Sequence, residues 1–550
     1  MIRVVRTTQN TGIVIAGLLL SILMASMDNS ITATAMGSII GELGGLDKFV
    51  WVTSAYMVAE MAGMPIFGKL SDMYGRKRFF VFGVICFMVG SALCGTADSI
   101  LQLSLYRAVQ GIGAGALVPI AFTIMFDAVP PESRGKLGGL FGAVFGLSSI
   151  FGPLLGAYIT DHIGWNWIFY INLPLGLIAF AMIAFFYKES AQHDRQVIDW
   201  TGAASLVGTI VCLVFAMELG GKTFAWDSAE IIGLFAGAAA LALLFVWAER
   251  RAVEPIISFA MFRSRLYATS NALAMLSGAA FITASVYIPI YMQGVLGGSA
   301  TNSGMVLLPM MLGTVVTATL GGSLLSKLSY RTILIPNVVI LVAGIALLTT
   351  LTSDTPRWIV TVYMVLVGLG VGATFSVLGN AAIHALPANK RGSASSTLNF
   401  LRSLGMTLGI TVFGIIQSHA MARKLSEALG GGTLGGSATA DGTAATAGDN
   451  GAGSLGGAAA NGGAGGNTGP DALGGLNLSD PHALMEPAAR SHIPHDLLAK
   501  VTDGLSSSIS ATFMWSLIPA VLALAAALLM SRERMDPAAE AEAEAYAAQH

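Results

Sequence analysis

Charged residues are scarce in this chain. Its 550 residues include 29 Lys and Arg and 31 Asp and Glu, which make up 11% of the sequence, whereas 54% of the residues are hydrophobic. Soluble globular domains carry roughly 25% charged residues, so this composition excludes a soluble enzyme and indicates a protein embedded in a lipid bilayer. The formal net charge is only −2 and the basic residues are spread along the whole length. The sequence therefore lacks the basic patch that nucleic-acid binding requires.

Cysteines and cofactor-binding motifs are scarce as well. The three cysteines, Cys86, Cys94 and Cys212, lie in apolar runs and lack the spacing of metal ligands, so we expect neither a disulfide framework nor a metal site. The glycine-rich segment 111–115 could suggest a dinucleotide-binding loop, but it lies inside an apolar run rather than after a strand, and that context argues against such a loop. The sequence contains no nucleotide-binding P-loop. We therefore expect no enzyme activity, no cofactor, and an ion gradient as the source of any work across the membrane.

Long apolar runs are abundant, and about 20 apolar residues are enough for a helix to cross a bilayer. The first run ends in small residues, as a signal peptide does, but it contains Asp28 and many further runs follow. We interpret it as the first transmembrane helix. The fold class predicted from hydropathy is an all-α membrane protein with fourteen transmembrane helices, at 13–35, 49–70, 79–96, 99–126, 137–160, 167–187, 200–219, 229–248, 268–292, 304–326, 332–352, 357–383, 393–419 and 508–531.

Lys and Arg are distributed unevenly between the predicted loops. The large majority fall in alternate loops, beginning with Arg3 and Arg6 before the first helix, and short loops rich in basic residues lie on the cytoplasmic side of a membrane. Because the number of spans is even, the sequence predicts a multi-pass protein of the cell membrane with both termini in the cytoplasm.

An internal repeat indicates how the helices are grouped. Residues 106–115 match residues 363–372 at an offset of 257, and loop residues 130–135 match 387–392 at the same offset. Two related six-helix bundles with an inserted helix pair are therefore predicted, and paired bundles are typical of transporters that bind substrate at the bundle interface. The predicted domains are an N-terminal bundle at 1–190, the inserted pair at 197–250, a C-terminal bundle at 268–531 and a cytoplasmic tail at 532–550.

The C-terminal bundle is interrupted by a predicted extracellular loop at 420–507. Its central part, 430–475, is dominated by Gly, Ala, Asn, Ser and Thr, a composition that cannot bury a core and is typical of a flexible tether. A short amphipathic helix is expected around 494–505, and the acidic segment 540–544 is expected to be solvated. A role of the loop in capturing substrate is the alternative to an inert tether.

Four charged residues fall within predicted helices: Asp28, Glu60, Arg107 and Arg402. Each such charge costs at least about 2.5 kcal/mol on insertion scales, so each is a candidate functional residue. Counting residues from the helix ends at 1.5 Å per residue places Asp28 and Arg107 both roughly 10 Å below the outer face, where they could meet. Burial penalises an ionised carboxylate and a neighbouring Arg favours it, and a group under both influences is suited to proton coupling. A fixed ion pair that only holds two helices together is the alternative.

Glu60 lies near the middle of its helix, where a carboxylate must be protonated, paired or in contact with water. It could bind a cationic substrate or a proton, or it could equally be a neutral acid hydrogen-bonded between helices. Arg402 is its nearest counterpart by depth, and we regard a transient Glu60–Arg402 pair as a hypothesis. Asp127 and Glu218 lie near helix ends, where their side chains are expected to reach water.

The predicted cytoplasmic loop between the second and third helices, 68–78, combines glycines with charged residues. Gly68 and Gly75 permit sharp turns, and Asp72 can accept hydrogen bonds from a helix N-terminus. This run resembles the signature cytoplasmic loop of the major facilitator superfamily. The resemblance implies that Asp72 and Arg76 form part of a latch between the two bundles that holds the outward-facing state. Anchoring by positive charge at Arg76 and its basic neighbours is the simpler electrostatic reading.

Two further runs extend the resemblance. Residues 107–113, with Arg107, look like the family's fourth-helix motif, whose Arg is associated with proton coupling. Residues 146–157 look like the fifth-helix motif typical of antiporters, although Ala157 stands where the family often has a second glycine. Its small residues allow close packing and its proline bends the helix, so tight packing alone also explains the run. The residues that carry this second match are Gly146, Gly152, Pro153 and Gly156.

Together with 27–29 in the first helix and the fourteen spans, these motifs resemble the fourteen-span drug:proton antiporters of bacteria. The family implies export of small amphipathic, cationic drugs in exchange for protons, a contribution to antibiotic resistance and function as a monomer in the lipid bilayer. Export of an endogenous metabolite or lipid is an alternative within the same class. A nontransporting membrane scaffold or receptor is the alternative from a different class.

Overall fold

The fold is taken from a computed structural model, which describes residues 10–44, 50–129, 131–188, 199–221, 223–297, 300–384, 386–428 and 495–534. The predictions for Arg3, Arg6, the segment 430–475 and the tail at 540–544 concern residues outside these ranges.

The described residues are helical apart from turns and one isolated bridge between Gly220 and Phe224. Several helices begin at a Ser or Asp whose side chain accepts a hydrogen bond from the backbone three residues on, as at Ser99, Asp199 and Ser329, and such caps stabilise a helix start. The helices of the first half are α1 (Thr11–Leu43), α2 (Val50–Tyr74), α3 (Arg76–Cys94), α4 (Ile100–Ala128), α5 (Pro131–His162), α6 (Trp167–Tyr170), α7 (Asn172–Phe186), α8 (Trp200–Leu219) and α9 (Ala229–Arg251).

The second half contains the short 3₁₀ turn η1 (Met261–Arg263), α10 (Arg265–Ile290) with its π-helical extension η2 (Tyr291–Val295), α11 (Ala300–Leu324), α12 (Tyr330–Leu348), α13 (Arg357–Ile383), α14 (Ala388–Ala428) and α16 (His495–Leu529).

Thirteen helices in the described ranges are long and apolar enough to cross a membrane, with α6 and α7 counted as one span. The 25-residue helix α2 is not among them; it contains Glu60, Lys69 and Asp72, which make it less apolar than its neighbours. The predicted all-α, multi-pass membrane fold is confirmed, and the fourteenth span stays a prediction.

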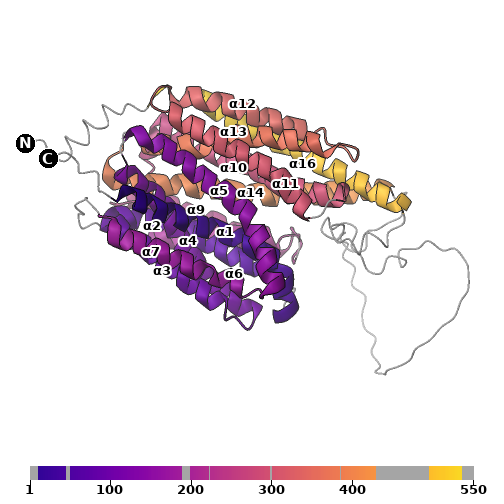
Figure 1. The fold of residues 1–550 in the computed structure, drawn as a ribbon, viewed down its shortest axis with the longest axis horizontal. Coiled ribbons are helices and arrows are strands. Elements are labelled where there is room, and N and C mark those ends of the chain that lie inside the picture. The colour runs from indigo at the N-terminus through magenta and orange to yellow at the C-terminus, as the bar shows by residue number, and fades with distance from the viewer. Residues whose placement is uncertain are drawn as a thin grey trace, which may run out of the picture.

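The helices form two bundles whose packing pairs correspond (Figure 1). In the N-terminal bundle α1 packs on α5 and α7, α4 packs on α2 and α3, and α3 packs on α7. The C-terminal bundle repeats every one of these pairs with α10 on α14 and α16, α13 on α11 and α12, and α12 on α16. Helices α8 and α9 pack on each other and, through α8, on α2. The chain therefore folds as a duplicated bundle with an inserted helix pair.

The two bundles meet along two corresponding seams. Helix α5 packs on α11 and α13, and α14 packs on α2 and α4; Figure 1 shows α5 running between the bundles. Because α5 corresponds to α14 and α2 to α11, each bundle offers the same pair of helices to the other. Such an interface lets the two bundles rock against each other.

The predicted loop at 420–507 is corrected at both ends, since α14 continues to Ala428 and α16 begins at His495. The residues expected to form a separate short helix at 494–505 belong to the start of α16, which continues without a break into the last spanning helix. Val501 and Leu505 are fully buried in the core of the C-terminal bundle, and Ser508 accepts a hydrogen bond from Gln417 Nε2 of α14 at 3.3 Å. The amphipathic pattern arises because this part of α16 packs along the end of α14.

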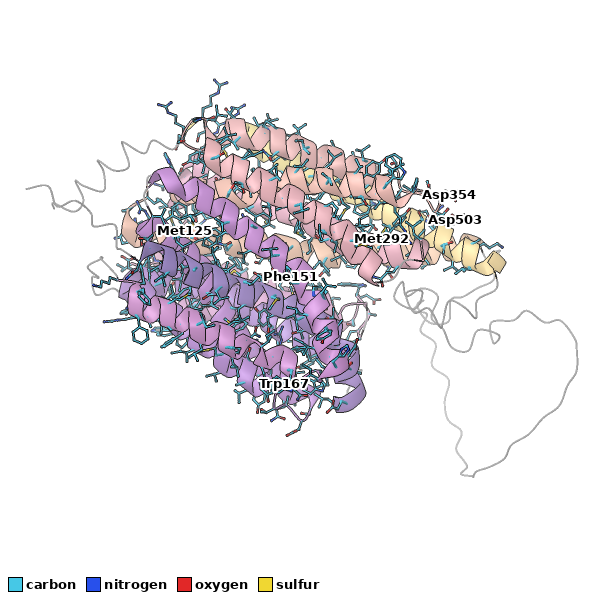
Figure 2. All side chains as sticks on the ribbon, viewed as in Figure 1. Met125, Phe151, Trp167, Met292, Asp354 and Asp503 are labelled. Carbon is cyan, nitrogen blue, oxygen red and sulfur yellow. The ribbon has the colours of Figure 1, made fainter. Side chains whose placement is uncertain are left out.

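The outer surface of the helices is apolar and the ends are polar (Figure 2). Phe151 and Trp167 are exposed on the outside of the N-terminal bundle, whereas Met292 is buried. Asp354 and Asp503 lie at the end of the C-terminal bundle where α16 begins, and Asp503 lines a cavity of about 520 Å³ there with Lys424 and Lys500. An apolar belt with charged ends is the surface that a bilayer requires.

Candidate functional site: a buried ion pair and an inter-bundle latch

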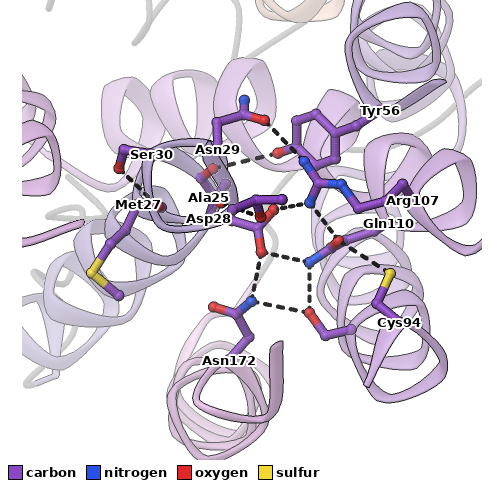
Figure 3. Close-up of polar contacts among 12 residues, drawn as sticks. Ala25, Met27, Asp28, Asn29, Ser30, Tyr56, Cys94, Arg107, Gln110 and Asn172 are labelled. Atoms are coloured by element: carbon purple, nitrogen blue, oxygen red, sulfur yellow. Dashed lines mark hydrogen bonds and ion pairs between the residues drawn. The ribbon is translucent and has the colours of Figure 1, made fainter. Parts of the chain in front are cut away.

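The structure brings Asp28 of α1 and Arg107 of α4 together inside the N-terminal bundle (Figure 3). Arg107 Nη1 donates a hydrogen bond to Asp28 Oδ2, and both side chains are at most 1% exposed. Counting residues along the two helices predicted this meeting. In a medium without water each charge depends on the other, because an isolated buried charge costs several kcal/mol.

Two side-chain amides complete the surroundings of the Asp28 carboxylate (Figure 3). Gln110 Nε2 and Asn172 Nδ2 each donate to Asp28 Oδ1 at 2.8 Å. The same two amides donate to the Ser91 hydroxyl, at 2.6 and 3.1 Å. Three donors from α4 and α7 therefore hold the Asp28 carboxyl group, and Ser91 of α3 orients two of them. Hydrogen bonds to charged groups are worth about 1.5–3 kcal/mol each.

The Arg107 guanidinium is equally well surrounded. It donates to Gln110 Oε1 at 2.8 Å and to Asn29 Oδ1 at 3.1 Å. Its Cζ lies 4.1 Å from the ring centroid of Tyr56 and 6.0 Å from that of Phe169, within the range of cation–π attraction. The network joins α1, α2, α3, α4, α6 and α7, and within the described residues Nε is the one guanidinium nitrogen of Arg107 that lacks a hydrogen-bond partner.

Glu60 lies one helical turn after Tyr56 on α2 and is half-buried. No described residue forms a hydrogen bond or an ion pair with its carboxylate, although Arg107 and Asp28 are close enough to interact with it electrostatically. A second acid without a direct partner thus lies near the buried ion pair.

Arg402 is not paired with Glu60. Its Nη2 donates to the Thr374 carbonyl at 3.2 Å, and its Cζ lies 4.6 Å from the Phe375 ring centroid. Helix α14 faces α2 through Phe400 and through Thr407, whose hydroxyl contacts Met61 Sδ at 3.5 Å. Position 402 lies on the opposite side of α14 from these residues, so the hypothetical pair is absent from this structure.

Asp72 joins the bundles at the end of the molecule where α2 ends and α14 begins. Its carboxylate accepts the backbone N–H groups of Gly392 and Ser393 of α14 at 2.9 and 2.8 Å. Arg76 lies 3.4 Å from the same carboxylate and also forms an ion pair with Asp127 of α4. Carboxylates bind strongly at helix N-termini because free N–H groups point at them. We call this group, with Arg391, the latch.

The latch glycines have identifiable roles. Gly75 has a φ of 111°, a conformation that L-residues with a side chain rarely adopt, and it lets the chain turn sharply from α2 into α3. Gly68 does not form the predicted turn, because it lies inside α2, and a Cβ atom there would lie 2.1 Å from Ser396 Oγ. Only glycine allows α2 and α14 to approach so closely.

The fifth-helix motif packs α5 against α1 beside the buried ion pair. A Cβ atom at Gly152 or Gly156 would lie 1.9 Å from Ser30 Oγ or 2.3 Å from Thr34 Oγ1. Gly146 faces Met311 of α11 instead, at 3.4 Å, and Pro153 lies inside the helix between these contacts. The motif therefore connects the helix of Asp28 to the inter-bundle seam.

Some residues of the site were not predicted from the sequence. Asp127 was expected only to reach water, yet it pairs with Arg76 and lies 3.5 Å from Arg391 of the other bundle. Asn172 and Ser91 were not singled out because uncharged residues carry little insertion penalty. A lone amide within the apolar run 167–187 was the available signal for Asn172. No group of three or more His, Cys, Asp or Glu residues in the described ranges could hold a metal ion.

This architecture and site define a membrane transporter built from two rocking bundles, and comparison with known proteins agrees. The Major Facilitator Superfamily model matches residues 18–410. The chain belongs to the Major Facilitator Superfamily, whose members are transporters of small molecules rather than enzymes. The resemblance seen in the sequence motifs is thereby confirmed.

The chain is similar along nearly its whole length to multidrug resistance protein 3 of Bacillus subtilis, with 50% identity over 531 residues that cover 96% of this chain and 97% of that protein. It is 36% identical over 417 residues to the multidrug transporter protein MdtP of the same organism, covering 76% and 77% of the two chains. The crystal structure of the human organic anion transporter MFSD10 shares the fold, with a TM-score of 0.54 and 15% identity over 75% of this chain and 94% of that one.

Proposed function

We propose that this protein exports amphipathic drugs across the cell membrane in exchange for protons, and that Asp28 carries the proton. The observation that carries this proposal is the burial of the Asp28 carboxyl group among three side-chain donors of the N-terminal bundle. The multidrug names of two relatives in Bacillus subtilis support drugs as the substrate class.

Protonation of Asp28 changes the network in a defined way. A neutral carboxylic acid no longer balances the Arg107 guanidinium and no longer needs two amide donors. Tyr56, which stacks on Arg107 and donates to the Ala25 carbonyl at 3.4 Å, links the pair to α2 and so to Glu60. Proton binding at Asp28 therefore changes the surroundings of Glu60, the acid that we assign to binding the cationic end of the substrate.

The transport cycle follows from competition between substrate and proton. Substrate arriving from the cytoplasm binds Glu60 and favours the ionised Asp28; the loaded protein opens outward; a proton from outside then releases the substrate and permits the return. On this proposal, a closed latch corresponds to the outward-facing state, as the family resemblance implies. No cofactor is involved, since the proton gradient and the membrane potential, about 2.3 kcal/mol per charge per 100 mV, supply the work. The protein would act as a monomer with both termini in the cytoplasm.

The test is drug uptake into everted membrane vesicles, measured with the cationic dye ethidium. We expect uptake that requires the proton gradient, that Asp28→Asn abolishes and that the exposed variant Asp354→Asn retains. Membrane insertion of each variant is checked by its amount in the vesicles. Uptake that persists after both the pH difference and the voltage are collapsed would contradict proton exchange.

A further inference from the structure

Arg402 is a buried cation without a counterion. It is 7% exposed, and among the described residues no carboxylate pairs with it. A guanidinium offers five N–H donors, yet the described contacts satisfy it with one carbonyl, that of Thr374. An uncompensated buried charge is strongly destabilising, and ionisable residues kept within a membrane are functional candidates by default. A structural role would be served equally well by an apolar side chain.

The surroundings of Arg402 are aromatic and lie at the seam between the bundles. The guanidinium of Arg402 lies over the face of the Phe375 ring of α13. The Phe375 ring in turn packs edge to face on the Phe281 ring of α10, with the two ring centroids 6.2 Å apart. The Cβ of Phe375 lies 3.8 Å from the position that a Cβ on Gly142 of α5 would take. The cation and the two rings therefore come from three helices of the C-terminal bundle and reach the N-terminal bundle through α5.

Arg402 and Glu60 lie at neighbouring depths on opposite sides of the interface. The helices α2 and α14 run in opposite directions side by side, as the Met61–Thr407 and Asp72–Gly392 contacts show. Arg402 is five residues nearer the latch than Thr407, and Glu60 is one residue farther from it than Met61. The base and the acid are therefore offset along the helices, by up to roughly 9 Å at 1.5 Å per residue.

We propose that Arg402, Phe375 and Phe281 form a subsite for the anionic end of an aromatic substrate, namely a carboxylate attached to a ring system. The proposal rests on the proposed export function and extends its substrate class from cations to zwitterions. A planar guanidinium binds a carboxylate through two parallel hydrogen bonds, and the phenyl rings stack on the ring that carries it. Glu60 then binds the cationic end from the opposite bundle.

The test compares two dyes that differ only in this group: tetramethylrhodamine, which has a free carboxylate, and its methyl ester. Binding to purified protein in lipid nanodiscs is measured by fluorescence anisotropy. Arg402→Gln is expected to weaken binding of the free acid about tenfold to hundredfold, the factor that corresponds to one hydrogen-bonded charge, and to leave binding of the ester unchanged. Arg402→Lys should retain part of the preference, and the exposed variant Arg357→Gln should match wild type.

Several results would overturn the subsite. If Arg402→Gln weakens the binding of both dyes equally, the residue has a structural role. If the variant binds both dyes as wild type does, the residue has no role in binding. Wild-type protein that binds the ester but not the acid, or neither dye, would exclude a carboxylate site. Failure of the proposed function would be seen separately, as dye uptake into vesicles that does not depend on the proton gradient. Thermal unfolding of each variant establishes that it is folded.

Discussion

Apart from the latch residue Arg76, each bundle buries one arginine, Arg107 or Arg402, and these two arginines have different surroundings. Arg107 in the N-terminal bundle faces a carboxylate, two side-chain amides and an aromatic ring. Arg402 in the C-terminal bundle contacts one carbonyl and one ring. The bundles share their helix packing, so the fold does not dictate this difference. On the proposals above, the arginine paired with a carboxylate holds the proton site, whereas the arginine without a described counterion binds a group from outside the chain.

The largest expected effect comes from breaking the satisfied pair. Arg107→Gln leaves the Asp28 carboxylate buried without a counterion, and loss of one partner of a buried pair lowers the free energy of unfolding by about 3–5 kcal/mol. Thermal unfolding in nanodiscs measures the loss. The double variant Asp28→Asn with Arg107→Gln should recover part of it; a double variant as unstable as the sum of its parts would show that the two residues do not interact.

Asn172 sharpens the comparison within the N-terminal bundle, because it donates to the carboxylate that pairs with Arg107, and no described carboxylate pairs with Arg402. Replacing it with Leu removes the 2.8 Å hydrogen bond to Asp28, at a cost of about 1.5–3 kcal/mol. We expect reduced stability together with reduced proton-driven ethidium uptake. Asn172→Asp, which places a second carboxylate beside Asp28, is the matched control for Asn172→Leu. Full uptake by Asn172→Leu would exclude a positioning role.

The latch is one of the contacts that join the two bundles. Asp72→Asn removes the charge that accepts the Gly392 and Ser393 N–H groups, and the loss of about 1–3 kcal/mol should shift the protein toward the inward-facing state. Ser395 donates a hydrogen bond to the Pro119 carbonyl of α4 across the seam at 3.4 Å. In a variant without the native cysteines, the alkylation rate of a cysteine introduced at position 395 measures how often this seam opens. An unchanged rate in Asp72→Asn would mean that other contacts hold the seam closed.

The smallest effect on the free energy of unfolding is expected at Arg402, and it has the opposite sign to the effect of Arg107→Gln. Arg402→Met removes a buried charge without leaving another charge unpaired, so the free energy of unfolding should stay the same or rise by about 1 kcal/mol or more. The measurement is the same thermal unfolding used for Arg107. A loss as large as that of Arg107→Gln would erase the difference between the two arginines.

Most of the fold could be predicted from the sequence because apolar runs have sharp ends. Helices α8 and α13 begin and end at the residues predicted by hydropathy, 200–219 and 357–383. The end of α1 could not be predicted in this way. It continues past 35 to Leu43, where Glu42 accepts a hydrogen bond from Trp165 Nε1 at 2.7 Å. Tertiary contacts of this kind are not visible in a single sequence.

The candidate site could be predicted only where it carries charge. Asp28 and Arg107 were found because charges within apolar runs are rare, and their meeting followed from the helical rise. The roles of Asn172 and Asp127 depend on which helices are neighbours, and a hydropathy pattern does not give the neighbours of a helix. The absence of a Glu60–Arg402 pair follows from the rotation of α14 about its axis, which depth alone does not fix.

The central claim is that Asp28 exchanges a proton for substrate, and proton release tests it most directly. Ethidium is added to purified protein in weakly buffered solution, and the pH is recorded for wild type, Asp28→Asn and Glu60→Gln. We predict that wild type releases protons in proportion to the dye bound, that Asp28→Asn binds without release, and that Glu60→Gln binds the dye more weakly. Proton release by Asp28→Asn equal to that of wild type would contradict the account.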